Sequence, residues 1–533
     1  MIEKEAKNFL INFANQTVPI QIKSNLSNFI ALTTGDKEEY SKLHQSKLEL
    51  HKIYSNPETF EIMKKFKESK EISDSMIKRE IEVLYPEFVE NQGSKLKEEI
   101  LTIETEIQEV FSKFRVNFKG KEINDNEVDK ILIESIDNKE LEDVWFASKQ
   151  IGGRVAPTVL KLVKLRNKLA NELGFENYYK MAMQLSEQDP NHINKIFDEL
   201  EKLTTPNFKK QKEQIDNFCS TKYNIKKEEL MVWHYQNRFF QAPPQIHNED
   251  MNKYFTDKDI VEITKNFYSN NYDPKSVKEI FEKSSLFPKE NKYQHACCLS
   301  IDNGIDTRVI CNVVPNYYWF STLIHEFAHA MTCKFVEESL PWILRTYNHL
   351  ITTEAVALLY EDLASNANFL VGIGILPKNE EKKTGVILDQ IRKLKQVVFA
   401  QFSQVMFRFE QELYQKELTE KEANILWWNL VEKYQLLKKP PNYENVCGWA
   451  SKIHLALNPC YYHFYLIGFL IQSQLKDFIL SNFGNNWIEN LKISDYLIQN
   501  VIRPGKTISW LELVKKATGK ELSSESYIKE YLN

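Results

Sequence analysis

Apolar residues recur at helical spacing along most of this chain. Between residues 36 and 118 they stand three or four positions apart among charged residues, as in EEYSKLHQSKLELHKIY, with one glycine, Gly93. This pattern predicts two or three long helices. The stretch from 139 to 203 repeats the spacing, and VAPTVLKLVKLRNKLANELGF within it predicts a helix that stops at Gly174. Helices are predicted again from Tyr318 to the end, with interruptions at 438–449 and around FGNNW.

The pattern changes between residues 293 and 314. Two runs rich in Val, Ile, Leu and Cys flank Asn303-Gly304 in YQHACCLSIDNGIDTRVICNVV. An Asn-Gly pair supplies the positive φ angles of a tight turn, so this segment predicts a β-hairpin. Loops are predicted before it at 241–250 and 286–292.

Composition supports a mainly helical fold. The 533 residues include 15 glycines and 17 prolines, so few positions break helices. The 69 basic and 74 acidic residues are mixed along the chain and give a net charge of -5, which argues against a nucleic-acid partner.

The cysteines and the hydropathy of the chain indicate the cellular compartment of the protein. The amino terminus has no apolar signal segment, and the most apolar stretches, 369–376 and 465–471, are too short to span a bilayer. The seven cysteines are scattered without CxxC spacing, which favours reduced thiols over a disulfide framework or a thiolate zinc site. We therefore expect a soluble, cytoplasmic protein without a membrane partner.

The segment STLIHEFAHAM (321–331) carries candidate metal chemistry. On a helix, residues four apart lie on one face, so His325 and His329 can converge on one cation while Glu326 faces a water beside it. A buried core helix that merely contains two hydrogen-bonded histidines is the alternative at this stage.

A catalytic zinc also needs a third protein ligand. Thr332 and Phe335 argue against the class of zinc site that adds a glycine and a third histidine just downstream, because they occupy those two positions. Glu354, in the apolar segment NHLITTEAVALLYEDLASN, is the expected ligand, with His349 as a rival donor.

A tyrosine-rich segment, SKIHLALNPCYYHFYLIGFLIQSQL (451–475), contains residues suited to binding a developing oxyanion. It holds His454, Tyr461, Tyr462, His463 and Tyr465. Core packing before an apolar helix is the alternative interpretation of the same residues.

These segments together resemble the peptidyl-dipeptidase A family of zinc metallopeptidases, that of angiotensin-converting enzyme. The family's hairpin CHAS…NGxDxR…C precedes its metal helix, as QHACCLSIDNGIDTRVIC precedes HEFAH here. TEAVALL resembles the family's HEAIGDVLAL, and ILWWNLVEKYQLLKKPPN and the tyrosine-rich segment resemble further family motifs. The likeness is strong from about residue 293 to 533 and weaker before it.

The resemblance implies one mainly α, two-lobed metallopeptidase body over residues 1–533, with a deep channel and a small β-hairpin at the active site. Residues 1–120 form a possible helical lid and 290–475 the catalytic centre. It implies one zinc per chain held by His325, His329 and Glu354, with Glu326 as general base. It also implies that His454 and Tyr465 steady the tetrahedral intermediate, and that His295 and the Ala296 backbone hold the substrate beside the hairpin edge.

Three departures from the family pattern matter. Leu358 replaces an aspartate that orients a zinc histidine, so Glu361 or Asp362 is expected to take that role. Gln294 replaces a cysteine, so Cys311 cannot form the family disulfide. Phe464 replaces an arginine that helps bind an activating chloride, and chloride is therefore not expected as a cofactor, although His463 beside it could carry charge.

Three functions are compatible with these residues. The first is release of carboxy-terminal dipeptides from short peptides, which requires a clamp for the free carboxylate; the resemblance implies Lys452, Tyr462 and a glutamine. The glutamine position falls on Tyr235, with Gln236 one step away, which weakens the clamp. The second is an endo-acting oligopeptidase of the thimet or oligopeptidase F kind. The third is an inactive peptide-binding protein. The oligomeric state is left open.

Overall fold

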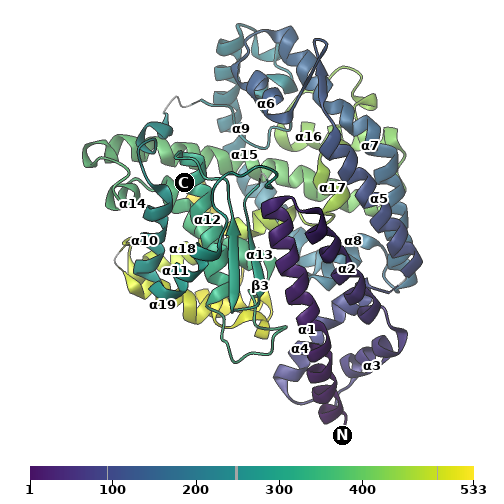
Figure 1. Ribbon diagram of the computed structural model, residues 1–533. Coiled ribbons are helices and arrows are strands. Elements are labelled where there is room, and N and C mark those ends of the chain that lie inside the picture. The colour runs from purple at the N-terminus through teal and green to yellow at the C-terminus, as the bar shows by residue number, and fades with distance from the viewer. Residues whose placement is uncertain (93, 247–249, 294, 489, 533) are drawn as a thin grey trace. The chain divides into compact units, whose positions relative to one another are not determined.

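The computed structural model describes residues 1–92, 94–246, 250–293, 295–488 and 490–532 (Figure 1). The chain forms two compact units, each assembled from segments that are distant in sequence. The first contains residues 1–92, 249–389 and 467–526, and the second contains 93–248, 390–466 and 527–533. Both units are mainly helical, as predicted. Within the described residues, none of the helices combines the length and apolarity that crossing a membrane requires.

The first unit contains eleven complete α-helices and one hairpin among its described residues. They are α1 (Ile2–Thr34), α2 (Lys37–Tyr54), α3 (Pro57–Glu68), α4 (Ser75–Glu90), α10 (Ile260–Asn271), α11 (Pro274–Lys283), β3 (Cys297–Asp302), β4 (Asp306–Ile310), α12 (Tyr317–Lys334), α13 (Leu350–Glu361), α14 (Ala367–Gly372), α19 (Leu491–Leu497) and α20 (Trp510–Thr518).

The second unit is also built from helices and one small hairpin. Its elements are α5 (Ser94–Lys113), β1 (Val116–Phe118), β2 (Lys121–Ile123), α6 (Asp125–Glu134), α7 (Asn138–Glu172), α8 (Tyr178–Leu185), α9 (Pro190–Tyr223), α16 (Glu420–Gln435) and α17 (Ile453–Leu457). Three helices contain a boundary between the units: α15 (Glu381–Gln415), α18 (His463–Phe483) and α21 (Glu525–Tyr531).

The stretch from 36 to 118 forms four helices, α2 to α5, rather than two or three long ones. New helices begin where a side chain caps the first turn, as at Asn56 before Pro57 and at Asp74. The prediction of helix as far as Phe118 is wrong at its end, where β1 pairs with β2. Lys119 and Gly120, at φ 50° and 76°, make the tight turn that this hairpin needs.

The predicted helix before Gly174 is α7, whose first turn is capped by the Asp137 carboxylate. Gly174 follows the helix at φ 86°, a backbone angle that favours glycine.

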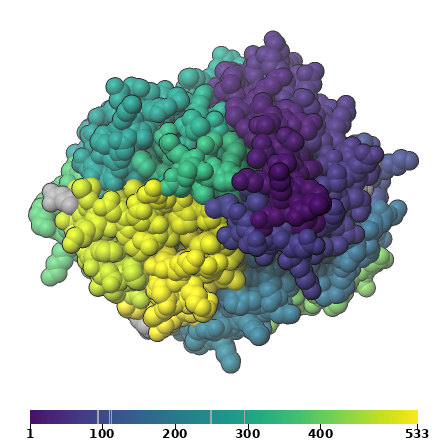
Figure 2. Space-filling view, turned by 90° about the horizontal axis from the view of Figure 1, so that it is seen from below, coloured from purple at the N-terminus to yellow at the C-terminus, as the bar shows by residue number. Residues whose placement is uncertain are grey.

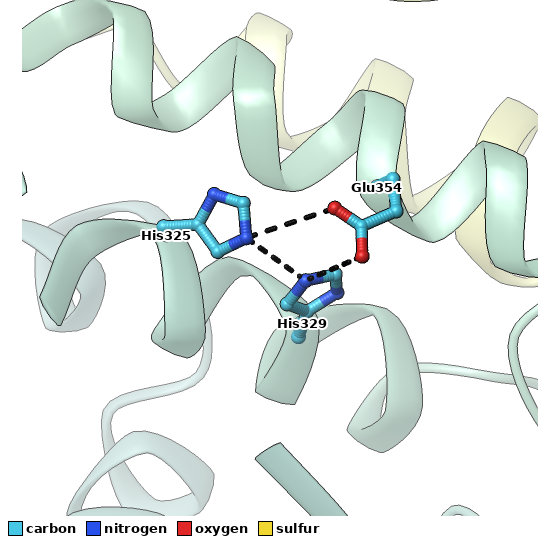
Figure 3. Close-up of side chains that lie close together, drawn as sticks. All are labelled: His325, His329 and Glu354. Carbon is cyan, nitrogen blue, oxygen red and sulfur yellow. Dashed lines mark hydrogen bonds and ion pairs between the residues drawn. The ribbon is translucent and has the colours of Figure 1, made fainter. Parts of the chain in front are cut away.

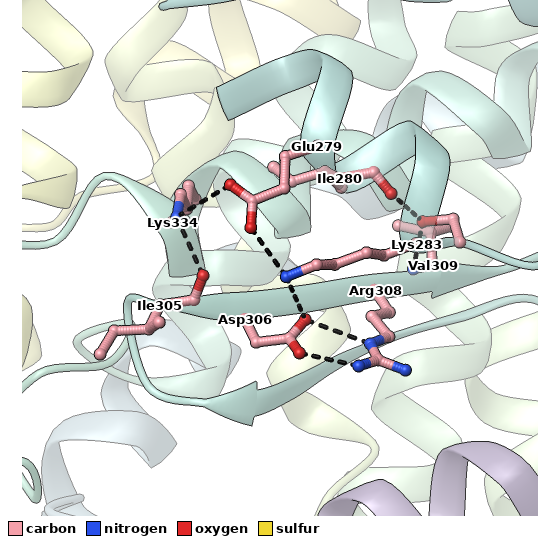
Figure 4. A network of polar contacts seen from close by, with 9 residues as sticks. Glu279, Ile280, Lys283, Ile305, Asp306, Arg308, Val309 and Lys334 are labelled. Atoms are coloured by element: carbon pink, nitrogen blue, oxygen red, sulfur yellow. Dashed lines mark hydrogen bonds and ion pairs between the residues drawn. The ribbon is translucent and has the colours of Figure 1, made fainter. Parts of the chain in front are cut away.

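The predicted hairpin is formed by β3 and β4 in antiparallel register, with Cys297 opposite Ile310. Its loop is longer than the expected two-residue turn: it spans 303–305, and only Gly304, at φ 73°, has a positive φ angle. Ionic contacts fix the hairpin to α11 and α12 (Figure 4). Lys283 lies 3.7 Å from Asp306, which binds Arg308 at 2.8 Å, and Lys334 donates to the Ile305 carbonyl at 2.9 Å.

The amino-terminal and carboxy-terminal segments of the first unit lie against each other (Figure 2). The buried Arg79 of α4 donates from Nε to the Lys506 carbonyl at 2.7 Å. On the other side of α4, apolar side chains pack into one core with α1 and α3; they include Leu10, Phe13, Phe66, Leu84 and Phe88. This core keeps α1 in place along its first half.

Candidate metal centre

Helix α12 carries the HEFAH segment and begins at a capped residue. The Asn316 side chain accepts a hydrogen bond from the Trp319 backbone at 2.8 Å, and the helix then continues to Lys334. Phe327 and Ala328 are fully buried on it, so its rotation about its own axis is fixed by packing. His325 and His329 consequently point to the same side, toward α13.

The structure brings His325, His329 and Glu354 together (Figure 3). The two Nε2 atoms lie 3.1 Å apart, and the Glu354 carboxylate oxygens lie 3.8 Å from His325 Nε2 and 3.9 Å from His329 Nε2. With bonds of about 2.1 Å, a tetrahedral zinc site separates its ligand atoms by about 3.4 Å. The three distances bracket that value, so this donor set fits zinc and leaves a fourth position open.

The expected rival ligand has a different role. His349 caps α13, where its Nδ1 accepts from the Ile351 backbone at 3.1 Å. His349 is not part of the cluster that Glu354 completes. It lies one residue before α13, whereas Glu354 lies a full turn inside that helix.

A carboxylate orients the ring of His325. His325 Nδ1 lies 2.9 Å from Glu361 Oε2, and since a carboxylate only accepts, Nδ1 donates to it. In the neutral ring, Nε2 then has the lone pair that a metal requires. Of the two partners proposed for this role, Glu361 is therefore the one in contact. Asp362 instead binds Lys476.

A pair of threonines orients His329, and the sequence analysis did not identify it. Thr332 donates to the His329 carbonyl at 2.8 Å, so its oxygen can accept from Thr353, 2.8 Å away. The Thr353 oxygen is then free to accept from His329 Nδ1, also at 2.8 Å. His329 is thereby held with Nε2 unprotonated and directed to the cluster.

The charged groups around the cluster change one another's proton affinity. Burial raises the pKa of Glu326 to about 7, with the Glu354 and Glu361 carboxylates adding to the effect. Burial lowers the pKa of His329 well below its usual range, and the His325 charge acts in the same direction. For His325, burial is outweighed by Glu361 and the other carboxylates, which raise its pKa to about 9.

A cavity of about 450 Å³ opens onto the cluster. We call it the metal cavity; its walls include Ala296, Ser300, Asn303, Cys333 and Tyr347 together with His325, Glu326, His329 and Glu354. Strand β3 thus forms one wall beside the candidate metal ligands. Of the two residues expected to hold substrate, Ala296 lines this cavity, whereas His295 is exposed next to it and packs against the Tyr293 ring. Gln294 lies outside the described residues.

The other expected site residues belong to the second unit and form a cluster there. Lys452 Nζ donates to Gln241 Oε1 at 2.6 Å, and the Tyr462 hydroxyl donates to the same oxygen at 3.3 Å. The His454 ring lies edge-on to Tyr462 at 5.3 Å between centroids, and Tyr465 lies 5.4 Å from Tyr462. The structure therefore brings Lys452, His454, Tyr462 and Tyr465 into one group.

The glutamine of this group is not where the sequence analysis expected it. Tyr235 is buried and donates to Asp216, and Gln236 accepts from the Gln245 backbone, so neither side chain reaches Lys452. Gln241 does. The intervening backbone turns at Gln236 and Phe240, with φ 57° and 50°, so matching this irregular loop to the family motif by sequence alone does not fix which residue reaches Lys452.

Comparison with known proteins supports the chemistry suggested by this geometry. The model of the family described as Peptidase family M3 matches residues 139–532, about three quarters of the chain. The chain belongs to peptidase family M3. A second family model, described as Angiotensin-converting enzyme, matches residues 1–214. The amino-terminal part of the chain is thus also similar to the angiotensin-converting-enzyme family.

Curated relatives match over shorter stretches. Angiotensin-converting enzyme-like protein Ace3 of Mus musculus is 21% identical over 193 residues, which are 34% of this chain and 23% of that protein. Angiotensin-converting enzyme of Rattus norvegicus is 28% identical over 145 residues, 26% of this chain and 11% of that protein. The match thus spans a quarter or less of the length of these relatives.

Replacing Glu361 is expected to weaken zinc binding by this member of family M3. Glu361→Gln removes the acceptor that fixes the His325 tautomer, and loss of such a partner lowers metal affinity by about tenfold to a hundredfold. Competition with a chromophoric chelator measures the change. Glu338→Gln, an exposed residue before α13, is the matched control, and equal affinity in the two variants would contradict the role of Glu361.

Proposed function

We propose that this chain hydrolyses short peptides in a zinc-dependent reaction and releases dipeptides from their carboxyl ends. The observation that carries the hydrolytic part is the convergence of His325, His329 and Glu354 beside the buried Glu326 in a member of peptidase family M3. The proposed partners are short peptides, with one zinc ion per chain, and nothing in the site suggests a nucleic-acid or membrane partner.

His325, His329 and Glu354 would hold the zinc ion, which supplies Lewis-acid chemistry that polarises a carbonyl and makes water more acidic. Glu326 takes the proton of the attacking water on its carboxylate and later passes it to the nitrogen of the departing amine. Burial and the neighbouring carboxylates raise the pKa of Glu326, which favours transfer of a proton to it.

His454 and Tyr465 are proposed to donate hydrogen bonds to the developing oxyanion. His454 Nδ1 is buried without a hydrogen-bond partner in the described part of the chain, so it is available to a ligand. Burial, together with the charge of Lys452, lowers the pKa of His454 to about 4, so the ring is neutral near pH 7 and one of its nitrogens is a donor. His295 and the Ala296 backbone are proposed to hold the substrate.

Release of dipeptides is proposed because of the Lys452 environment. Lys452 is 9% exposed. Its Nζ donates to the neutral Gln241 side chain and has no carboxylate partner within the described residues. A buried ammonium without a counter-ion is costly, and a substrate carboxylate would supply the missing charge. Nζ has three N–H groups, so two are left for that carboxylate beside the Tyr462 hydroxyl.

An endo-acting oligopeptidase is the second candidate, favoured by the family that covers most of the chain. An inactive peptide-binding protein is a remote third. We also propose a reducing compartment such as the cytoplasm, since all seven cysteines are free thiols.

Digestion of paired peptides tests the proposal. Each peptide is supplied with a free and with an amidated carboxyl terminus, and mass spectrometry identifies the products with and without a chelator. Dipeptides released from the free-terminus peptides, lost with chelator and restored by zinc, are the expected result. Internal cleavage of both forms would favour the endopeptidase, and no cleavage of either form by zinc-loaded protein would favour the binding protein.

Activity is expected not to depend specifically on chloride. Phe464 is buried between the rings of Tyr461 and His463, and an apolar ring cannot offset the desolvation of an anion. His463 is buried as well, with Nε2 2.8 Å from the Gln188 side chain. Replacing chloride by acetate at constant ionic strength should leave kcat/KM within about twofold. A rise of about tenfold in chloride would contradict this expectation.

A further inference from the structure

A second cavity of about 480 Å³ lies in the first unit, between α1, α4 and residues 339–343. We call it the α1 cavity. Its walls are mainly apolar and include Leu10, Phe13, Ile77, Leu84 and Trp342. Among the described residues it shares none of its lining with the metal cavity. The volume of the α1 cavity lies within the range of about 300 to 1,000 Å³ that small-molecule sites occupy.

Glu80 places a carboxyl group in the wall of this apolar cavity. It lines the cavity from α4 and is half-buried, and in the described part of the chain its carboxylate forms no hydrogen bond or ion pair. Burial and the nearby Asp74 raise the pKa of Glu80 to about 7. Asp74 is already occupied, because it accepts from the Met76 and Ile77 backbone as the cap of α4. Among the described residues of the lining, Lys7 is the one cation, and it is exposed.

We propose that the α1 cavity binds an amphipathic organic cation. Its ammonium group would pair with the Glu80 carboxylate, which otherwise stands without a partner against apolar walls. Its hydrocarbon or aromatic part would pack against Leu10, Phe13 and Trp342. The described lining includes two carboxylates and one exposed lysine, so the cavity disfavours anions. Its apolar walls favour an organic cation over a hydrated metal ion.

Two hydrogen-bonded connections join the α1 cavity to the hairpin beside the metal cavity. Gln21, which lines the α1 cavity, donates to Asn25 at 3.0 Å, and Asn25 donates to the Ser300 carbonyl of β3 at 3.0 Å. Trp342 Nε1 donates to Asp302 at 2.9 Å. Ser300 lines the metal cavity, so a bound cation that holds Gln21 and Trp342 in place also fixes the strand that substrate would contact. Occupancy of the α1 cavity therefore lowers KM, a consequence that rests on the proposed function.

Binding is tested with dansylcadaverine, a fluorescent amphipathic amine, titrated into zinc-loaded Glu326→Gln protein so that no turnover is needed. Saturable binding with a blue-shifted emission is expected, about tenfold weaker in Glu80→Gln and weaker also for the uncharged N-acetyl probe. Ala14→Phe, which fills the cavity but leaves Glu80, should also weaken it. Glu87→Gln, an exposed glutamate of α4 outside the lining, is the matched control.

Equal affinity of Glu80→Gln and Glu87→Gln, or no saturable binding to either, would overturn the site. The kinetic consequence is measured separately in the active protein, where saturating probe should lower KM for a peptide about threefold, and not in the Ala14→Phe variant. An unchanged KM despite binding would overturn the link to the hairpin. Because binding is measured in Glu326→Gln, a protein without peptidase activity would count against the proposed function and leave the binding result standing.

Discussion

Glu326→Gln is expected to reduce kcat/KM by about a thousandfold while zinc remains bound. A positioned general base contributes about a hundredfold to ten-thousandfold to a rate, and glutamine cannot accept the proton of the attacking water. The Glu326 side chain is not part of the cluster that His325, His329 and Glu354 form, so the donor set for zinc is intact in this variant. Hydrolysis of an internally quenched peptide gives the rate, and elemental analysis of dialysed protein gives the zinc content.

Glu354→Gln provides the contrast. It removes the charged ligand, so we expect loss of both zinc and activity, whereas Glu326→Gln should lose only activity. The two changes have the same chemistry, and both residues line the metal cavity. Full activity of Glu326→Gln would exclude it as the base. Loss of zinc from that variant would mean that Glu326 helps to hold the metal.

The metal cluster was largely predictable from local patterns. The helical period alone places His325 and His329 on one face, and the apolar segment around Glu354 indicates a buried helix. The choice between Glu354 and His349 depended on where α13 begins. Because His349 caps that helix, its side chain is already used by the backbone, which a single sequence does not reveal directly.

The groups that orient the histidines were harder to predict from the sequence. Glu361 was one of two candidates because both it and Asp362 follow the buried segment, and only the geometry at the end of α13 separates them. Thr353 was missed because a threonine inside an apolar helix normally bonds to its own backbone. Its pairing with His329 requires the packing of α12 on α13, which is a tertiary contact and leaves no periodic signal in the sequence.

The mainly helical class of the fold and the hairpin β3–β4 could be predicted from the sequence, but the irregular segments could not. The hairpin β1–β2 had a signal in Lys119-Gly120, but the surrounding helical periodicity outweighed it. Gln241 lies in a loop with left-handed residues, where neither a helical nor a strand period fixes position. Residues on regular elements were therefore placed well by spacing, and the glutamine that contacts Lys452 was not.

Lys452→Ala is expected to raise KM for peptides with a free carboxyl terminus by about a hundredfold, a change of about 2.7 kcal/mol. Amidated peptides should change much less, because they present no charge to Nζ. Initial rates on the paired peptides give KM for each form. Lys421→Ala, an exposed lysine of the same unit, is the control for loss of a positive charge alone.

The pH dependence of KM distinguishes a role for Lys452 in binding the substrate carboxylate from a role in packing. Burial, with a smaller contribution from Arg238, lowers its pKa to about 7, so the charged form predominates at pH 6 and the neutral form at pH 8. Only the charged form attracts a carboxylate, so KM for free-terminus peptides should rise between pH 6 and 8, and the rise should disappear in Lys452→Ala. A lysine that merely packs against the Phe239, Phe402 and Tyr462 rings would affect both peptide forms equally. Equal KM changes for free and amidated peptides would thus remove the basis for dipeptide release and favour internal cleavage.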